Sequence, residues 1–362
     1  MTASDRLTKA EPRSAKDRLY WADAAKGISI LLVVLLHAVA WSEYVVNVPE
    51  WLGATNDALA PLRMPLFFCI SGIFAAKWMT EPWQDTYGNK LALLVWTFLI
   101  WQPIVFSYKL MSGHFLPNQP RSEIADHLLR LAVTVVRPNG ELWFLWALVL
   151  FIVTAKWLHR IPRLLQVASA SVVSAVWYFC SDNYLTPDQL RAIGDGWDGA
   201  LGLFVFFLAG LLYRDEIKKW VAKTPVSVSA GLMAVAGVAL WGYYIADLSG
   251  YFALPLAIRV IGLACGIGAA VVFSRISVIR YWGTVTLPIY LGHTAIIAIS
   301  CSILAVTLDD LPAGNRMVGV LFPLFLAAFA IFVSLQVYRL RNSRIGFYLY
   351  NPPNWFIRSG SR

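Results

Sequence analysis

Residues 26–37 read KGISILLVVLLH, and eight of the ten residues between Lys26 and His37 are Ile, Leu or Val. The surrounding residues extend this apolar run over 21–42, and a helix needs about 20 mostly apolar residues to cross a bilayer. The stretch therefore predicts a membrane-spanning helix with an ionisable group near each end. The eleven-residue spacing is close to three helical turns, so both side chains lie on one face, about 16 Å apart along the axis.

The composition of the whole chain extends this prediction to a polytopic membrane protein. Of its 362 residues, 58% are hydrophobic and only 14% are charged, whereas soluble domains are about one quarter charged. We expect one all-α bundle of about ten transmembrane helices. The predicted spans are 21–42, 59–79, 89–109, 141–158, 164–181, 198–213, 225–246, 252–273, 284–306 and 317–338.

The distribution of charge between these spans predicts the topology. Lys and Arg concentrate in alternate loops, and the loops between them are acidic or neutral, as the positive-inside rule expects. Both termini are predicted to be cytoplasmic: a tail at 1–20, a transmembrane domain at 21–338 and a tail at 339–362. The loop at 110–140 is basic although it is predicted to lie outside, and we expect it to be structured. Because this pattern accounts for the net charge of +9, the predicted partner is the lipid bilayer and not nucleic acid.

The first span also resembles a cleavable signal peptide, because Ala38-Val39-Ala40 resembles a peptidase site. Lys26 and His37 lie inside the apolar region, which a disposable signal is not expected to carry. We therefore interpret the segment as a retained signal-anchor. The absence of N-x-Ser/Thr acceptor sites and of a long extracytoplasmic domain favours a bacterial inner membrane as the location.

Three ionisable residues follow one face of the first span. Asp23 lies one turn before Lys26, where its carboxylate can pair with the ammonium group. With a cytoplasmic N-terminus, Asp23 and Lys26 lie near the inner surface and His37 lies near the outer surface. An ionisable group inside a membrane usually faces the bundle interior or a water-filled cavity. The alternative is that Asp23 and Lys26 extend to the headgroups and that His37 is an interfacial residue.

Two further charges are predicted at the outer surface. Arg63 begins the second span, where it is either a headgroup anchor or a ligand for an anionic group. Glu141 begins the fourth span, where it is either solvated or paired with Arg63 or His37.

Polar residues deeper in other spans are candidates of a different kind. Arg259 lies about 10 Å into the eighth span, which favours a functional or ion-pair role. His293 falls near mid-depth in the ninth span and is either a helix–helix hydrogen-bond partner or a reactant. For Ser71 and Gly72, close helix packing is the expected role. Four cysteines lie singly in apolar stretches without metal-ligand spacing, so no metal site is predicted.

Four motifs occur in a fixed order along the chain: YWADAAKGISILLVVLLH at 20–37, MPLFFCISGIF at 64–74, ELWFLWAL at 141–148 and LPIYLGHTA at 287–295. Together they resemble the acyltransferase family 3 of membrane O-acyltransferases. That family carries a basic residue, ten intervening residues and a histidine in its first helix, which here are Lys26 and His37.

The resemblance implies an enzyme that transfers an acyl group, generally from cytoplasmic acetyl-CoA, to a hydroxyl of an extracytoplasmic glycan or lipid. It implies that Lys26, oriented by Asp23, meets the donor. His37 is then a general base or a transient acyl carrier. The remaining implied roles are tautomer selection by Glu141 or, less favoured, Asp198; oxyanion stabilisation by Arg63 or Arg259; and donor contacts by Lys90 and Ser71.

The sequence departs from the family pattern in one place. Many members carry an Arg-x-x-Arg pair before the third helix, where this chain reads TYGNKLALL with only Lys90. Some members carry an additional SGNH esterase-like domain, and this chain is expected to be the stand-alone form because it ends about 24 residues after the last span. The acceptor remains open between polysaccharide, periplasmic glucan, glycolipid and lipid-linked precursor, and the acyl group between acetyl and succinyl.

Two other functions compete with an enzyme. Intramembrane Arg, Lys and His also mark the substrate pathways of transporters and flippases, although these typically contain inverted repeats and no convincing repeat is present here. A structural subunit of an envelope-polymer assembly would tolerate substitution of both Lys26 and His37.

Overall fold

The computed structural model describes residues 19–116, 124–138, 140–307 and 316–358, and every regular element within these ranges is a helix. Nine of the described helices are long and apolar enough to cross a membrane. A shorter apolar helix of 16 residues at Trp143–Leu158 matches the fourth predicted span, 141–158, which brings the number of matched spans to ten. The predicted all-α polytopic fold is confirmed. Of the predicted tails at 1–20 and 339–362, residues 1–18 and 359–362 lie outside the described residues.

The ten apolar helices follow the predicted spans closely. They are α2 (Tyr20–Ser42), α4 (Ala60–Ala75), α6 (Ala92–Phe115), α8 (Trp143–Leu158), α9 (Arg163–Tyr184), α11 (Asp195–Leu212), α13 (Val226–Ile245), α14 (Leu254–Phe273), α16 (Thr286–Thr307) and α17 (Arg316–Arg339). Shorter elements connect them: α3 (Glu50–Ala58), η1 (Ala76–Met79), α5 (Trp83–Thr86), η2 (Tyr87–Leu91), α7 (Ile124–Val133), α10 (Pro187–Ile193), α12 (Arg214–Lys223), α15 (Ser277–Thr284), η3 (Leu340–Asn342), α18 (Arg344–Tyr350) and α19 (Asn354–Arg358).

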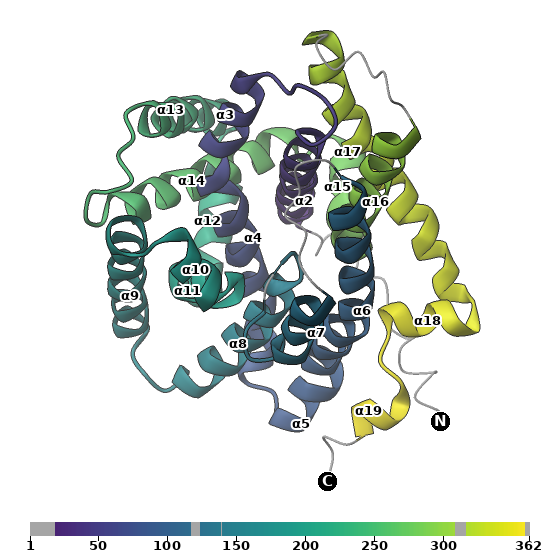
Figure 1. Ribbon diagram of the computed structural model, residues 1–362. Helices are drawn as coiled ribbons and strands as arrows, with labels where there is room; N and C mark the ends of the chain where they lie inside the picture. The colour runs from purple at the N-terminus through teal and green to yellow at the C-terminus, as the bar shows by residue number, and fades with distance from the viewer. Residues whose placement is uncertain (1–18, 117–123, 139, 308–315, 359–362) are drawn as a thin grey trace.

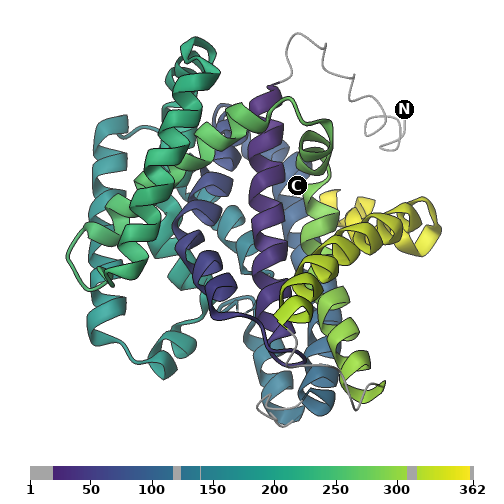
Figure 2. The same ribbon diagram turned by 90° about the horizontal axis from the view of Figure 1, so that it is seen from above.

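Helix α2, which contains the opening motif, occupies the middle of the bundle (Figures 1 and 2). It packs against α4, α14, α15, α16 and α17. Glycines allow α15 to cross it closely: a Cβ on Gly27 would overlap the Ile279 backbone, and a Cβ on Gly283 would overlap the Asp23 backbone. The central position keeps the polar face of α2 inside protein, where an ionisable side chain finds partners and not lipid.

A second close contact joins α4 to α11. A Cβ on Gly72 would overlap the Phe207 carbonyl, and a Cβ on Gly210 would overlap the Cys69 carbonyl. Small residues at such crossings let two helix backbones approach, so the packing role predicted for this part of α4 is confirmed at Gly72. Buried aromatic rings, including Phe68 and Phe151, fill the space toward α8.

The loop predicted to be structured contains α7, an amphipathic helix that packs against α6. Arg130 lies in the last turn of α7, and Arg137 donates a hydrogen bond to the Arg191 carbonyl. The described part of this loop is thus tied to the bundle, whereas Arg121 lies outside the described residues.

Candidate active site

A cavity of about 440 Å³ opens at the end of the bundle where α2 and α6 finish and where α4, α8 and α11 begin, and Tyr290 of α16 also lines it. We call it the His37 cavity. Its charged and polar lining residues come from six separate parts of the chain: His37, Arg63, Lys109, Glu141, Asp195 and Tyr290. The structure therefore brings together three of the residues that the sequence predicts as catalytic, His37, Arg63 and Glu141.

The cavity follows one face of α2 toward Lys26. Ile30 and Val33 line it together with His37, and the seven helical steps from Ile30 to His37 span about 10 Å. Lys26 lies about one turn beyond Ile30 on the same face. His37 therefore stands in the cavity wall, and Lys26 lies beyond Ile30, the α2 lining residue nearest to it.

His293 packs against His37, with the two ring centroids 5.1 Å apart and the ring planes at 51°. It is completely buried, and its Nδ1 lies 2.7 Å from the Tyr290 carbonyl oxygen. A carbonyl only accepts, so Nδ1 carries the hydrogen and Nε2, 3.1 Å from the Thr294 hydroxyl, is an acceptor. Both ring nitrogens are thereby engaged within α16, and the ring serves as a fixed surface beside His37.

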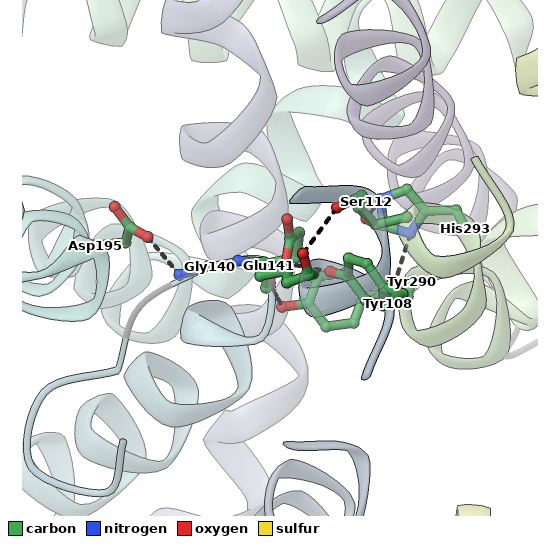
Figure 3. A network of polar contacts seen from close by, with 9 residues as sticks. Tyr108, Ser112, Gly140, Glu141, Asp195, Tyr290 and His293 are labelled. Carbon is green, nitrogen blue, oxygen red and sulfur yellow. Dashed lines mark hydrogen bonds and ion pairs between the residues drawn. The ribbon is translucent and has the colours of Figure 1, made fainter. Parts of the chain in front are cut away.

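Glu141 is the centre of a polar network that surrounds this end of the cavity (Figure 3). Its carboxylate accepts a hydrogen bond of 2.6 Å from the Tyr108 hydroxyl and lies 3.3 Å from the Lys109 ammonium. The Tyr290 hydroxyl donates to the Glu141 backbone carbonyl. The sequence did not predict the roles of Tyr108 and Lys109 or this contact of Tyr290. In the sequence, Tyr108 and Lys109 are only two adjacent polar residues at the outer end of the third predicted span.

The charge of Glu141 is set by these neighbours. Glu141 precedes the first residue of α8. Burial raises the pKa of its carboxyl, but Lys109, His37 and the Tyr108 hydroxyl together lower this pKa to about 2. A carboxylate therefore faces the same space as His37 at neutral pH. Such a group can select the tautomer of an imidazole and stabilise its protonated form.

The backbone before Glu141 depends on a glycine. Gly140 has φ of +80°, which is the left-handed region that favours glycine, and its N–H donates to the Asp195 carboxylate. A Cβ at this position would overlap the Lys109 ammonium. The small residue and the Asp195 contact together aim Glu141 into the cavity.

Arg63 forms another part of the cavity wall and is only 4% exposed. Its Nη1 donates a hydrogen bond of 2.6 Å to the Asn56 side chain. A guanidinium carries five N–H groups, so the contact with Asn56 fixes the side chain and leaves donors for an anionic group in the cavity.

Two other candidates lie away from the His37 cavity. The guanidinium of Arg259 stacks 3.7 Å above the Tyr178 ring and donates to the Pro255 carbonyl. Asp198 accepts a hydrogen bond of 2.8 Å from the Trp177 indole. Neither residue lines the cavity, so the geometry gives Arg259 no access to an oxyanion beside His37 and gives Asp198 no contact with the imidazole.

The residues predicted to meet the donor lie at the opposite end, which we call the Lys26 end. The Lys26 ammonium is 3.9 Å from the Asp23 carboxylate, in the predicted pair, and 3.9 Å from the Phe74 ring centroid. Lys90, in the π-helical turn η2, interacts electrostatically with Lys26 and with Lys77.

Ser71 lies on the face of α4 that runs between the two ends. Phe67, one turn toward the His37 end, lines the cavity, and Phe74, one turn toward the other end, contacts Lys26. The Ser71 hydroxyl donates to the Phe67 carbonyl at 2.8 Å. The α2 and α4 faces thus connect the Lys26 end to the His37 cavity.

Comparison with known proteins assigns this arrangement to a family. A family model described as an acyltransferase domain matches residues 19–339. The chain belongs to the acyltransferase family 3. The match contains every candidate site residue, and the apolar helices make the chain a multi-pass membrane protein of this family.

Three curated relatives are similar to parts of the chain. The nodulation protein NolL of Mesorhizobium japonicum is 26% identical over 46% of this chain and 43% of its own length. The inner membrane protein YcfT of Escherichia coli is 22% identical over 64% of this chain and 68% of its own. NolL of Sinorhizobium fredii is 32% identical over 34% of this chain and 32% of its own. The match therefore spans less than half of either NolL protein. No solved structure matches the chain.

Proposed function

We propose that this protein is an O-acyltransferase that moves an acyl group, in the first place acetyl, from cytoplasmic acyl-CoA to a hydroxyl of an extracytoplasmic glycan or glycolipid. The observation that carries the proposal is the convergence of His37, Glu141 and Arg63 on one cavity. This set provides a base, a carboxylate to orient the base and a cation for a developing oxyanion. The similarity to the inner membrane protein YcfT supports a bacterial inner membrane as the location.

The transfer needs three groups in the roles that the cavity offers. His37 removes the proton of the acceptor hydroxyl, and the acceptor oxygen attacks the thioester carbonyl. Arg63 stabilises the negative charge on the carbonyl oxygen of the tetrahedral intermediate. The carbon–sulfur bond then breaks, and the departing CoA thiolate takes the proton from the His37 imidazolium. Glu141 stabilises that imidazolium while it exists.

A variant of this scheme uses His37 as a carrier. The imidazole first attacks the thioester and releases CoA, and the acceptor hydroxyl then attacks the acyl-imidazole. The two schemes place the same groups around the same atom. They differ in whether an acylated enzyme accumulates when acceptor is withheld.

The donor is proposed to enter from the Lys26 end. Lys26, with Lys90 close enough to interact electrostatically, provides positive charge for donor phosphates where the family's Arg-x-x-Arg pair is missing. The face of α2 and α4 then leads the acyl arm toward His37.

The test is acetyl transfer in membranes. Membranes that contain the intact chain, incubated with labelled acetyl-CoA, are expected to produce a labelled glycan or lipid that mass spectrometry identifies. His37→Ala should abolish the label without changing the amount of inserted protein. His114→Ala is the matched control, because His114 is an exposed histidine in the last turn of α6 and does not line the cavity. Substrate movement without covalent change would instead identify a transporter.

A further inference from the structure

Residues 339–362 contain five arginines and no acidic residue. Three of the arginines, Arg339, Arg341 and Arg344, follow one another closely where α17 ends and η3 and α18 begin. Their side chains are exposed, and among the described residues no carboxylate forms an ion pair with any of them. We call residues 339–348 the arginine segment. It carries positive charge that the acyl transfer at the His37 cavity does not use.

The elements that hold the arginine segment do not supply a negative charge either. Here η3 packs against α17 and α18 packs against α6, and neither α6 nor α17 contains Asp or Glu. The guanidinium of Arg341 lies 4.1 Å from the centre of the Tyr338 ring in α17. Such a contact orients a cation but does not neutralise it. The charge of the segment is therefore available to an anion from outside the chain.

The backbone next to the arginines is fixed to the bundle. The Trp96 indole of α6 donates to the Tyr348 carbonyl at 2.7 Å. The Trp101 indole, one to two turns further along α6, donates to the Leu349 carbonyl at 2.8 Å. Tyr350 is buried and packs against the Trp101 ring, with the ring centroids 5.9 Å apart. A binding surface that is held in place before the ligand arrives loses less conformational entropy on binding.

The surface on both sides of the arginines is apolar and exposed. Phe325 and Phe332 of α17 are exposed, as expected on the lipid-facing side of a membrane-spanning helix. Beyond α17, Leu340, Phe347 and Tyr348 are exposed as well, and α18 lies at the edge of the bundle, away from α2 (Figures 1 and 2). Basic residues among exposed aromatic residues at the end of a span are typical of the boundary between lipid and water, where they attract anionic headgroups.

We propose that the arginine segment binds anionic phospholipid of the surrounding bilayer. The guanidinium groups of Arg339, Arg341 and Arg344 donate hydrogen bonds to the phosphate oxygens of the headgroup, a geometry for which arginine is well suited. The exposed Leu340 and Phe347 side chains pack beside the apolar part of the same lipid. The site is separate from the acyl transfer, because none of these residues lines the His37 cavity.

The experiment is lipid binding by the purified, delipidated full-length chain in a neutral detergent, titrated with lipid and followed by native mass spectrometry. Phosphatidylglycerol is the anionic probe and phosphatidylcholine is the neutral probe. The intact chain is expected to bind phosphatidylglycerol at least about tenfold more tightly. Replacing Arg339, Arg341 and Arg344 together by Gln should weaken phosphatidylglycerol binding about 100-fold, since each arginine contributes about fivefold, or about 1 kcal/mol. Binding of phosphatidylcholine should not change.

Two further variants serve as controls. Replacing the same three arginines by Lys keeps the charge and should keep phosphatidylglycerol affinity within about threefold. Replacing Lys218, Lys219 and Lys223 of α12 by Gln removes the same number of charges from a helix that carries its own acidic residues, and this variant should bind phosphatidylglycerol as the intact chain does. The melting temperature of each variant without added lipid separates lost binding from lost folding.

The outcomes decide the inference without involving the proposed function. Equal phosphatidylglycerol affinity in the intact chain and the triple Gln variant of the arginines would overturn it and would leave these arginines to an acidic protein surface. Equal affinity of the intact chain for the two lipids would also overturn it, because the headgroup charge would then not be recognised. An equal loss in the α12 variant would show that total charge, and not the arginine segment, determines lipid binding. Labelled acetyl transfer tests the acyltransferase proposal separately in each case.

Discussion

The most informative single substitution is Glu141→Gln, which keeps the shape of the side chain and removes its charge. In the intact chain the carboxylate is held by Tyr108 at 2.6 Å and by Lys109 at 3.3 Å, and it interacts with His37. An interaction with a charged group contributes about 1.5–3 kcal/mol. If the stabilisation of the His37 imidazolium is of this size, kcat falls roughly 10- to 150-fold, because each 1.36 kcal/mol corresponds to a factor of about ten.

The same substitution should leave donor affinity unchanged. Glu141 is at the opposite end of the bundle from Lys26, so KM for acetyl-CoA should stay within about twofold of the wild-type value. Initial rates of labelled acetyl transfer in membranes, measured over a range of acetyl-CoA concentrations, give kcat and KM separately. Glu43→Gln is the control, since Glu43 is an exposed carboxylate just after α2. An unchanged kcat in the Glu141 variant, or a loss confined to KM, would refute the assignment of Glu141 to the reaction centre.

Three further predictions follow from positions elsewhere in the bundle. Lys26→Ala should raise KM for acetyl-CoA about tenfold, from the loss of one ionic contact of about 1.4 kcal/mol, with little change in kcat; a selective loss of kcat would contradict the donor role. Arg63→Met should lower kcat about 10²- to 10³-fold, as removal of an oxyanion donor does, whereas Arg259→Met should keep kcat within about threefold in the same assay; equal losses would implicate Arg259 after all. Gly72→Val should destabilise the bundle by about 1–3 kcal/mol through overpacking and lower its melting temperature, while Gly237→Val, where a Cβ meets nothing within 4 Å, should not; equal melting temperatures would show that α4 and α11 do not touch as described.

Hydropathy was sufficient to predict the helices, because in a membrane the length of an apolar run is set by the bilayer and not by the fold. The predicted span at 21–42 is observed as Tyr20–Ser42, and the span at 317–338 as Arg316–Arg339. The fourth span, predicted at 141–158, is observed as the 16-residue helix Trp143–Leu158.

The site was predictable only where sequence spacing fixes geometry. Lys26 and His37 belong to one helix, so periodicity alone places them on one face. The position of Arg259 deep in its span predicts that the guanidinium has a partner, but it does not predict which one. In the structure the partner is the Tyr178 ring and not the reaction centre.

Tyr108 and Lys109 could not be recognised from the sequence for a related reason. Polar residues at the end of a span are ordinary interfacial residues by composition. Only the approach of α6 to the segment before α8 brings them within 3.3 Å of the Glu141 carboxylate. By sequence, Asp195 is likewise one of several acidic residues in a loop. In the structure its carboxylate accepts the hydrogen bond of the Gly140 N–H and so helps to position Glu141.

The central claim is that the acyl-CoA donor and the hydroxyl acceptor reach the His37 cavity from opposite sides of the membrane. Sealed inside-out and right-side-out vesicles that carry the intact chain and its native envelope components test it directly, with labelled acetyl-CoA added only to the external medium. Inside-out vesicles, which in the proposed topology expose the Lys26 end, should incorporate label into the glycan or lipid fraction, and right-side-out vesicles should do so only after they are opened. Equal incorporation by both kinds of sealed vesicle would contradict transfer from one side to the other.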